Sequence, residues 1–503
     1  NGGSQALIVR LYKLADSGNG DTTGGDTGDT TGGDTGDTGG DTGGDTGGTD
    51  TVGDTASAAS AAKAGLDAKG LKLEAAYEGA WGNNLHARID HNVSDQMSWV
   101  AANSLTKNDL FNLTVHDTDT AVTETFANVT VKESPRRVDR VLKNESNLVR
   151  FPGSETLPTA RPGKHDDPAP SESNKLWQDD KFSSKVTTLA AKSAALDVNA
   201  YKGSRANKTG LYALEKADIF NLLCIPPDTR TGNTSQDVFS EALTYCVERR
   251  AMLIVDSPAV WNDVDKAIKG IRGEGANEGK IALSGTNTRN AALYFPRVTQ
   301  ADPLREGQLD TFVPCGLVAG AMARTDVQRG VWKAPAGIDV SLNGTRGLSA
   351  NLTDDENGML NPLGINCLRG FPIIGRVIWG SRTLRGADLL ADEYKYVPVR
   401  RLALYIEESL YRGTQWVVFE PNDEPLWAQI RLNVGAFMHN LFRQGAFQGA
   451  TPREAYLVKC DRETTTQNDI NLGIVNIVVG FAPLKPAEFV IIKIQQLAGQ
   501  VEA

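Results

Sequence analysis

The residues that most often bind metals or catalyse reactions are few and scattered in this chain. No two of its five histidines have metal-ligand spacing on an expected helix. Neither the HExxH pattern of zinc proteases nor the GxSxG turn of serine hydrolases occurs. The sequence therefore predicts no catalytic residue, no cofactor-binding residue and no metal site. The histidines are His86, His91, His116, His165 and His439.

One glycine-rich segment, residues 273–280, resembles a phosphate-binding loop in composition only. In the pattern GxxxxGK[ST], Glu274 stands at the first glycine and Ile281 replaces the hydroxyl that binds magnesium. We interpret the segment as a surface turn. The cysteines stand singly in apolar surroundings, which is typical of reduced, buried thiols in a cytosolic protein. They are Cys224, Cys246, Cys315, Cys367 and Cys460.

The net charge of −10 comes from one segment. Residues 16–55 contain ten aspartates and no glutamate, lysine or arginine. Without those ten, the 62 acidic residues become 52 and balance the 52 basic ones. These totals argue against a nucleic-acid binder with a strongly basic field. The Gly-Asp-Thr repeat of this tract has almost no apolar residue, so we expect a disordered, solvated loop.

The remaining elements can be placed by their periodicity. Residues 70–150 have alternating or β-branched segments between Gly, Asn and Asp, which predicts a β-rich region. Residues 151–183 are rich in Pro, Asp, Ser and Lys, which predicts a loop. After Leu211, apolar strands alternate with helically spaced segments, which predicts an α/β body. No apolar run reaches 18 residues, so no transmembrane helix is expected, and no signal peptide is expected at this N-terminus.

The expected strands are Ala6–Leu11, Leu71–Ala76, Leu85–Ile89, Phe111–His116, Thr123–Val131, Arg140–Val149, Ile219–Ile225, Met252–Val255, Ala291–Phe295, Ala455–Lys459, Leu472–Gly480 and Phe489–Ile494. The expected helices are Ala56–Ala64, Gln236–Arg250, Val260–Arg272, Val397–Tyr411 and Pro425–Gln444.

Several segments, in order along the chain, are similar to the motifs of one family. They are the opening Asn1–Arg10, Tyr77–Asn83 (YEGAWGN, with Glu78 in place of a Pro), Gly330–Gly337 (GVWKAPAG), Leu360–Asn366 (LNPLGIN), Trp379–Leu384 (WGSRTL), Phe419–Asn422 (FEPN) and Gly480–Phe489 (GFAPLKPAEF). Together they resemble the tail sheath proteins of contractile phage tails and phage-tail-like contractile injection systems. The resemblance covers the chain from about residue 70 to its end and is weakest across 84–200.

The resemblance implies an α/β (α+β) fold, in which a sheath-type body with a mixed sheet and flanking helices carries an inserted β-rich domain. It divides the chain into six regions. They are an opening strand at 1–15, the acidic insert and Ala-rich lead-out at 16–66, a β-rich outer region at 67–200, the α/β sheath body at 201–380, a C-terminal sheath domain facing the tube at 381–486, and a C-terminal strand and arm at 487–503. The family's N-terminal arm is expected to be missing from this sequence.

The same resemblance implies a structural protein and not an enzyme. Sheath subunits form six-membered rings stacked as a helical cylinder around an inner tube, and contraction drives the tube through a target envelope. The implied partners are further copies, the inner tube protein, and baseplate and terminal cap proteins, without nucleic acid or membrane insertion. The implied location is the bacterial cytoplasm during assembly, and then a phage tail or injection particle.

Two sets of residues are candidates for contacts in such an assembly. A strand near the C-terminus has apolar residues on both faces, which suits addition to a neighbour's sheet, although an internal strand remains open. Its residues are Phe489, Val490, Ile491, Ile492, Lys493, Ile494, Gln495 and Gln496. Four arginines could face an acidic tube or be solvated or paired elsewhere. They are Arg431, Arg443, Arg453 and Arg462.

Three other functions remain open at this stage. A sheath-like terminal or baseplate-associated subunit is the main alternative, followed by an α/β enzyme and by a secreted adhesin with an acidic repeat. If the chain is a sheath subunit, we expect the acidic tract to project from the outer surface and to be dispensable for assembly.

Overall fold

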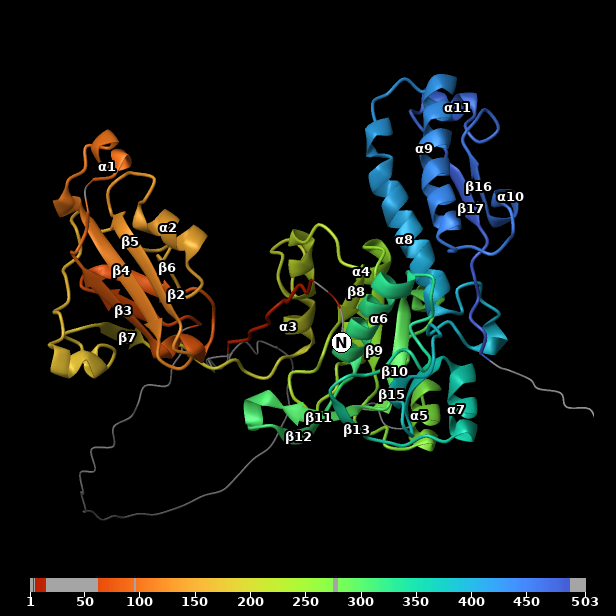
Figure 1. Cartoon of the computed structure of the whole chain (residues 1–503), viewed down its shortest axis with the longest axis horizontal. Coiled ribbons are helices and arrows are strands. Elements are labelled where there is room, and N and C mark those ends of the chain that lie inside the picture. Colours follow the sequence, from red (N-terminus) through yellow and green to blue (C-terminus); the bar gives the residue numbers. More distant parts are fainter. Residues whose placement is uncertain (1–2, 4, 15–61, 95, 275–278, 489–503) are drawn as a thin grey trace, which may run out of the picture. The chain divides into compact units, whose positions relative to one another are not determined.

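The computed structural model describes residues 3, 5–14, 62–94, 96–274 and 279–488. The acidic Gly-Asp-Thr tract, most of the Ala-rich segment after it, and the strand expected at 489–494 lie outside these residues. The chain divides into two compact units (Figure 1). Unit 1 comprises Asn1–Arg10 and Asp197–Ala503, and unit 2 comprises Leu11–Leu196.

Unit 2 is built on one antiparallel sheet of seven strands in the order β5-β4-β3-β7-β1-β2-β6. Leu85, Ala87 and Ile89 of β3 are fully buried in its core, as the period-two pattern predicts. The strands expected between residues 71 and 131 are confirmed. The elements are β1 (Gly65–Ala68), β2 (Leu71–Ala75), β3 (Leu85–Asp90), α1 (Ser98–Ala102), β4 (Leu110–Asp117), β5 (Thr123–Thr130), α2 (Val138–Glu145), β6 (Val149–Arg150) and β7 (Ser184–Thr188).

The expected strand Arg140–Val149 is wrong, because most of it belongs to helix α2. Val138, Val141 and Leu142 are buried, and their i, i+3, i+4 spacing places them on one face of a helix. Only Val149 and Arg150 form a strand, which pairs with the end of β2. The β-branched valines favoured a strand, but packing of the helical face decides the structure.

A buried histidine links the sheet of unit 2 to the long loop that follows β6. His165 is 1% exposed, and its Nδ1 accepts a hydrogen bond of 3.0 Å from the backbone N–H of Ile89. Its Nε2 lies 3.0 Å from the hydroxyl of Ser184. A ring nitrogen that accepts from an N–H has no room for a proton of its own. Burial and the nearby positive charge of Lys69 lower the pKa of His165 to about 4.

We expect unit 2 to lose stability as the pH falls from 6.5, the ordinary His pKa, to about 4. In this window the unfolded chain protonates residue 165 while the folded chain keeps it neutral, so stability that is complete above pH 6.5 is lost on acidification. The loss should be roughly 3 kcal/mol. Urea unfolding of the full chain at several pH values measures it.

In a His165→Asn variant, the side-chain oxygen accepts the same Ile89 N–H bond but does not titrate. The decline in stability should become shallower in this variant. A His439→Gln variant, changed in unit 1, should keep the slope of the unmodified chain. An identical slope in all three proteins would show that His165 does not cause the decline.

Unit 1 has at its centre a five-stranded sheet in the order β15-β14-β10-β9-β8. Neighbouring strands run parallel except β15, which is antiparallel to β14, so the expected mixed sheet is confirmed. All residues of β9 and β10 are buried, which fits a sheet covered on both faces. The strands are β8 (Leu222–Cys224), β9 (Met252–Asp256), β10 (Ala291–Phe295), β14 (Ile365–Phe371) and β15 (Gly375–Ile378).

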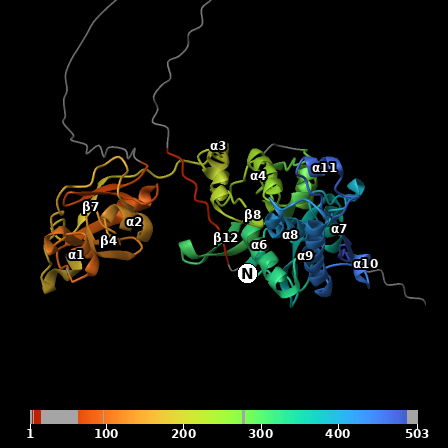
Figure 2. The same ribbon diagram turned by 90° about the horizontal axis from the view of Figure 1, so that it is seen from above.

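Helices cover both faces of this sheet (Figures 1 and 2). Helices α4 (Gln236–Glu248) and α5 (Val264–Ile271) pack in one core with Leu253 and Leu293. Helix α6 (Cys315–Arg329) packs in a second core with Met252 and Tyr294, which point to the other face. The smaller elements of this part are α3 (Val198–Lys202), β11 (Val298–Asp302), β12 (Gln308–Phe312), β13 (Thr345–Leu348) and α7 (Asp354–Leu360).

The C-terminal part of unit 1 has its own core between two long helices and a two-stranded sheet (Figure 1). Both helices were expected within two residues of their observed ends. The expected strand at Leu472–Gly480 is only partly formed, because β17 begins at Val478. The elements are α8 (Val397–Gly413), α9 (Glu424–Arg443), α10 (Pro452–Ala455), β16 (Tyr456–Lys459), α11 (Gln467–Asn471) and β17 (Val478–Phe481).

The opening strand expected at Ala6–Leu11 is not formed. Residues 5–14 belong to no sheet among the described residues, and the side chain of Ile8 is 88% exposed. An apolar run becomes a strand only where another strand supplies its hydrogen bonds.

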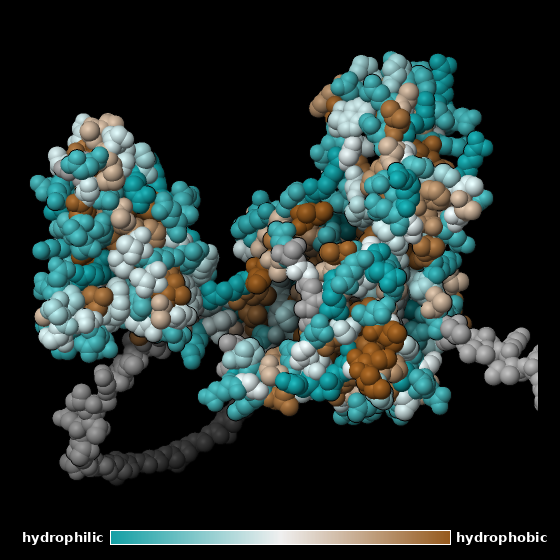
Figure 3. Space-filling model, viewed as in Figure 1, coloured by the Kyte–Doolittle hydropathy of each residue, from teal (hydrophilic) through white to brown (hydrophobic). Residues whose placement is uncertain are grey.

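The face of the molecule drawn in Figure 3 is mostly polar, and the apolar residues of unit 1 gather on it in separate patches.

Candidate functional site

Four segments that carry the sequence resemblance meet at one place in unit 1. Residues from Gly330–Gly337, Leu360–Asn366, Trp379–Leu384 and Ala482–Glu488 line a groove of about 600 Å³, which we call the motif groove. The rings of Trp332 and Trp379 form part of its wall. Because these segments are far apart in sequence, their meeting is a property of the fold and points to a shared role.

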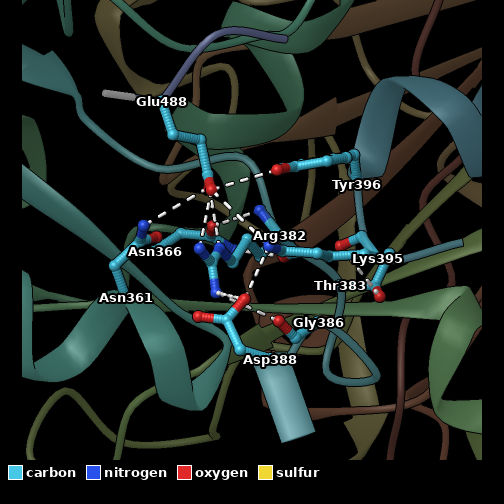
Figure 4. Close-up of polar contacts among 9 residues, drawn as sticks. All are labelled: Asn361, Asn366, Arg382, Thr383, Gly386, Asp388, Lys395, Tyr396 and Glu488. Carbon is cyan, nitrogen blue, oxygen red and sulfur yellow. Dashed lines mark hydrogen bonds and ion pairs between the residues drawn. The ribbon is translucent and has the colours of Figure 1, made fainter. Parts of the chain in front are cut away.

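A buried arginine lies at the centre of this region. The side chain of Arg382, which follows β15, is 0% exposed (Figure 4). Its Nε and Nη2 donate to the two carboxylate oxygens of Glu488 at 2.7 and 2.6 Å. Its Nη1 donates to the Gly386 carbonyl at 3.2 Å and to Asp388 at 3.1 Å. All three nitrogens of the guanidinium therefore have acceptors, as a buried charge requires.

Glu488 receives more hydrogen bonds than those of the arginine. Asn361 Nδ2 donates to its Oε1 at 3.3 Å, and the hydroxyl of Tyr396 donates to its Oε2 at 3.1 Å. The carboxylate is 14% exposed, and Lys395 Nζ lies 3.8 Å from it. Glu488 is the last described residue before the segment 489–503. Side chains from three separate segments thus hold the chain at the root of its C-terminal segment.

The charges and hydrogen bonds of the cluster keep both Arg382 and Glu488 ionised. Burial alone would raise the pKa of Glu488, but the hydrogen bonds from Arg382, Asn361 and Tyr396 hold it below its ordinary value. Burial would likewise lower the pKa of Arg382, but contact with Glu488 and Asp388 keeps it above its ordinary value. Lys395 donates to Asp388 at 2.6 Å. Two cations and two carboxylates therefore balance within the cluster.

The backbone around Arg382 is fixed by a buried amide. Asn366 on β14 donates from Nδ2 to the carbonyls of Leu293 and Arg382, and its Oδ1 accepts from the backbone N–H of Arg382 at 2.6 Å. Gly380 lies against it, and a Cβ there would come within 2.8 Å of Asn366 Cα. The asparagine of LNPLGIN and the glycine of WGSRTL are thus explained by one close contact.

Two further arginines attach the C-terminal part of unit 1 to elements that flank the central sheet, helix α6 and the turn before β10. Arg401 on α8 donates to both carboxylate oxygens of Asp326 on α6, at 2.8 and 2.6 Å. Arg400 Nε donates to Asn290 Oδ1 at 3.0 Å. Both arginines are buried. Helix α8 therefore begins in the body and ends in the C-terminal core, where Leu402 and Ile406 pack.

The predicted assembly residues lie in different settings. Arg431 on α9 donates to Glu424 Oε1 at 2.6 Å and to the Cys460 carbonyl, so its guanidinium is already used within the chain. Arg443, Arg453 and Arg462 are exposed. The predicted strand Phe489–Gln496 lies outside the described residues. Contact with a tube or a neighbouring copy stays a prediction for all of them.

Over the described residues, no three His, Cys, Asp or Glu side chains gather closely enough to hold a metal ion. Four of the cysteines are buried and Cys224 is half-buried, all as free thiols. Within the described ranges, no helix is both long and apolar enough to cross a membrane.

Comparisons with known proteins identify the family. The phage tail sheath protein central domain matches residues 195–384, and the phage tail sheath C-terminal domain matches residues 391–496. The helical sheath of the anti-feeding prophage in its contracted state is 30% identical over 61% of this chain and 77% of that chain, with a TM-score of 0.48. The chain belongs to the phage tail sheath family. This sheath subunit is a structural component of a contractile particle and not an enzyme.

Two other solved structures are similar to the sheath subunit. A chain of the anti-feeding prophage baseplate is 30% identical over 61% of this chain and 75% of that chain, with a TM-score of 0.48. A sheath tail protein from Listeria innocua is 13% identical over 84% of this chain and 81% of that chain, with a TM-score of 0.50. The Listeria protein supports the fold alone. No curated protein matches the chain.

The central ion pair of the sheath subunit was not among the predicted site residues. Arg382 and Glu488 are 106 positions apart, so no local pattern connects them. The available signal was indirect, because each is a charged residue inside a motif of otherwise apolar or small residues, WGSRTL and APLKPAEF. A charged side chain in such surroundings usually has a buried partner.

Proposed function

We propose that this sheath subunit polymerises as stacked six-membered rings around an inner tube and that its contraction drives the tube through a target envelope. The observation that supports this most directly is the Arg382–Glu488 pair. It fixes the chain immediately before the segment Phe489–Gln496, whose sequence has apolar residues on both faces. A segment fixed at its root, with two faces to cover, is suited to bridging between copies.

Strand addition explains how copies could stay connected while they move. An added strand is held by a ladder of main-chain hydrogen bonds, and its alternate side chains fill pockets on either side. The hydrogen bonds of such a ladder lie between the added strand of one copy and the sheet of the copy that receives it. The bodies of both copies can therefore rotate as rigid units without breaking these bonds. Side-chain patches between the bodies can then change during contraction.

The regions of the chain take separate roles in this proposal. Residues 381–486 face the tube, and the exposed Arg443, Arg453 and Arg462 are candidates for contact with it. Residues 67–200 form the outer region. The acidic tract projects from the outer surface, since a long polar segment needs water for its backbone groups. The remaining proposed partners are the tube protein and a terminal cap, and assembly takes place in the bacterial cytoplasm.

A second candidate function is a sheath-like subunit of the baseplate or of the particle's end. The similarity to a chain of the anti-feeding prophage baseplate favours it. The difference between the two functions lies in how far the polymer grows, because an end subunit stops at a ring whereas a sheath subunit continues to add rings.

Electron microscopy of the full chain, expressed with and without a tube protein, separates these functions. Long striated cylinders are the expected result for a sheath subunit. Isolated rings would assign the chain to the particle's end. A chain that remains monomeric under both conditions would overturn the proposal that it polymerises around a tube.

A further inference from the structure

Two histidines lie side by side on neighbouring strands of unit 2. His86 on β3 and His116 on β4 are directly opposite each other in the antiparallel ladder (Figure 1). The side chains of such a pair leave the same face of the sheet, with Cβ atoms about 4.5–5.5 Å apart. This face is turned away from the apolar core, because the alternate residues Leu85, Ala87 and Val115 are buried in it. Both imidazoles are half-buried, so they are neighbours at the surface of unit 2.

Each of the two rings uses its Nδ1 within the chain. His86 Nδ1 lies 3.3 Å from the Asn84 carbonyl oxygen, and because a carbonyl can only accept, this nitrogen carries the ring proton. His116 Nδ1 lies 2.8 Å from the hydroxyl of Thr123, its partner on β5, which accepts in the same way. Within the described ranges, no hydrogen bond engages Nε2 of either ring. Both Nε2 lone pairs are therefore available to a ligand.

The orientation of the His116 ring is fixed by an aromatic stack as well. Trp177, in the loop between β6 and β7, lies flat against it, with ring centroids 4.6 Å apart and an angle of 18° between the planes. The stack covers a face of the imidazole, whereas the Nε2 lone pair lies in the ring plane and stays accessible. Burial and the neighbouring His86 ring lower the pKa of His116, so it is neutral at neutral pH. Neutral imidazole is the form that binds metal ions.

The two basic side chains nearest to the histidines on this face already have acidic partners. Lys185 lies opposite His86 on β7, and its Nζ is 3.2 Å from a carboxylate oxygen of Asp180. Arg88, two residues along β3, donates to two backbone carbonyls and to the carboxylate of Asp167. Neither cation therefore leaves an uncompensated positive charge that would repel a metal ion from the histidine pair.

We infer that His86 and His116 together bind one divalent transition metal ion through their Nε2 atoms, with Cu²⁺ preferred over Ni²⁺ and Zn²⁺. Histidines that bind metals usually donate their other ring N–H to an oxygen acceptor, which is the arrangement of both rings here. The described residues bring no third His, Cys, Asp or Glu close enough to join them, so water completes the coordination. This inference goes beyond the proposed function, because it concerns a small cation on unit 2 and not a contact between copies.

Titration of the full chain with the Cu²⁺ complex of iminodiacetate tests the inference. The chelator leaves copper positions for two imidazoles and shields the metal from the carboxylates of the acidic tract. One complex should bind per chain, quench the fluorescence of Trp177 and show two imidazole nitrogens by electron paramagnetic resonance. His86→Gln or His116→Gln should weaken binding at least about tenfold, since the loss of an outer-shell partner alone costs that much. A matched His91→Gln variant, whose Nε2 faces the Pro162 carbonyl in the unmodified chain, should bind normally.

A variant that keeps both ligands tests how the site is oriented. Thr123→Val removes the oxygen beside His116 Nδ1 and should weaken copper binding about tenfold, whereas Thr123→Ser should retain it. The melting temperature of each variant without copper shows that the chain is folded. Equal affinity of the unmodified chain and of the His86→Gln, His116→Gln double variant would overturn the inference, as would a single coordinated imidazole. Equal affinity of the two Thr123 variants would overturn the orienting role of the hydroxyl.

Discussion

Replacing Arg382 with methionine should lower the free energy of unfolding of unit 1 by about 3–5 kcal/mol, because it leaves the Glu488 carboxylate buried without its partner. Asn361 and Tyr396 would still donate to that carboxylate, but neither carries a charge. Lys395 lies 3.8 Å away, beyond hydrogen-bond distance, and already donates to Asp388. Urea unfolding of the full chain measures the loss. Tryptophan fluorescence is a suitable signal, since Trp332 and Trp379 line the adjacent groove.

A matched control separates burial from pairing. Arg412 also contacts two carboxylates, Asp218 and Glu408, but its side chain is exposed. Arg412→Met should therefore cost much less stability than Arg382→Met, because an exposed ion pair is screened by water and salt. Comparable losses in the two variants would contradict the central role of Arg382.

A double replacement of the ion pair distinguishes stability from positioning. In Arg382→Met, Glu488→Met, both buried charges are removed together, so much of the lost stability should return. Assembly should remain impaired, because the root of the C-terminal segment is no longer held by directed hydrogen bonds. Full recovery of assembly along with stability would show that the pair serves folding alone.

Deleting residues 489–503 should abolish polymer formation while leaving the folded units intact. Every described core and the Arg382–Glu488 pair lie before this segment, so the melting temperature should be nearly unchanged. If the segment completes a neighbour's sheet, its loss removes the main-chain ladder between copies. Sedimentation and electron microscopy measure the outcome.

Deletion of residues 17–54 is the control for this truncation. It removes more of the chain, but from the acidic tract, and assembly should proceed normally. A truncated chain that still forms long cylinders would refute the bridging role of Phe489–Gln496. A tract deletion that prevents assembly would refute the expectation that the tract is dispensable.

The spacing of apolar residues correctly predicted the helices and strands whose formation depends mainly on their own residues. The α8 and α9 helices were placed correctly because their apolar residues follow helical spacing, and strand β10 was placed correctly because its five residues form one apolar run. Arg140–Val149 was misassigned because a short helix with three buried aliphatic residues and a short strand look alike in composition. The opening segment at Ala6–Leu11 failed for another reason, since strand formation depends on a partner that the segment itself does not specify.

The candidate site was only partly accessible from the sequence. The motifs around Trp332, Asn366 and Arg382 were recognised as a set, but their meeting in one groove depends on the order of the sheet. The partner of Arg382 could not be chosen among 62 acidic residues without that order.

The hydrogen bonds at Glu488 also determine where a mechanical pull on the C-terminal segment would be felt. Tension applied beyond Glu488 passes through its carboxylate to the guanidinium of Arg382, and from the Arg382 backbone to Asn366. Asn366 is bonded in turn to Leu293 on β10, the middle strand of the five. A force that one copy exerts on its neighbour would therefore be spread across a whole sheet. Several bonds would have to yield together before the segment could be pulled away from the body.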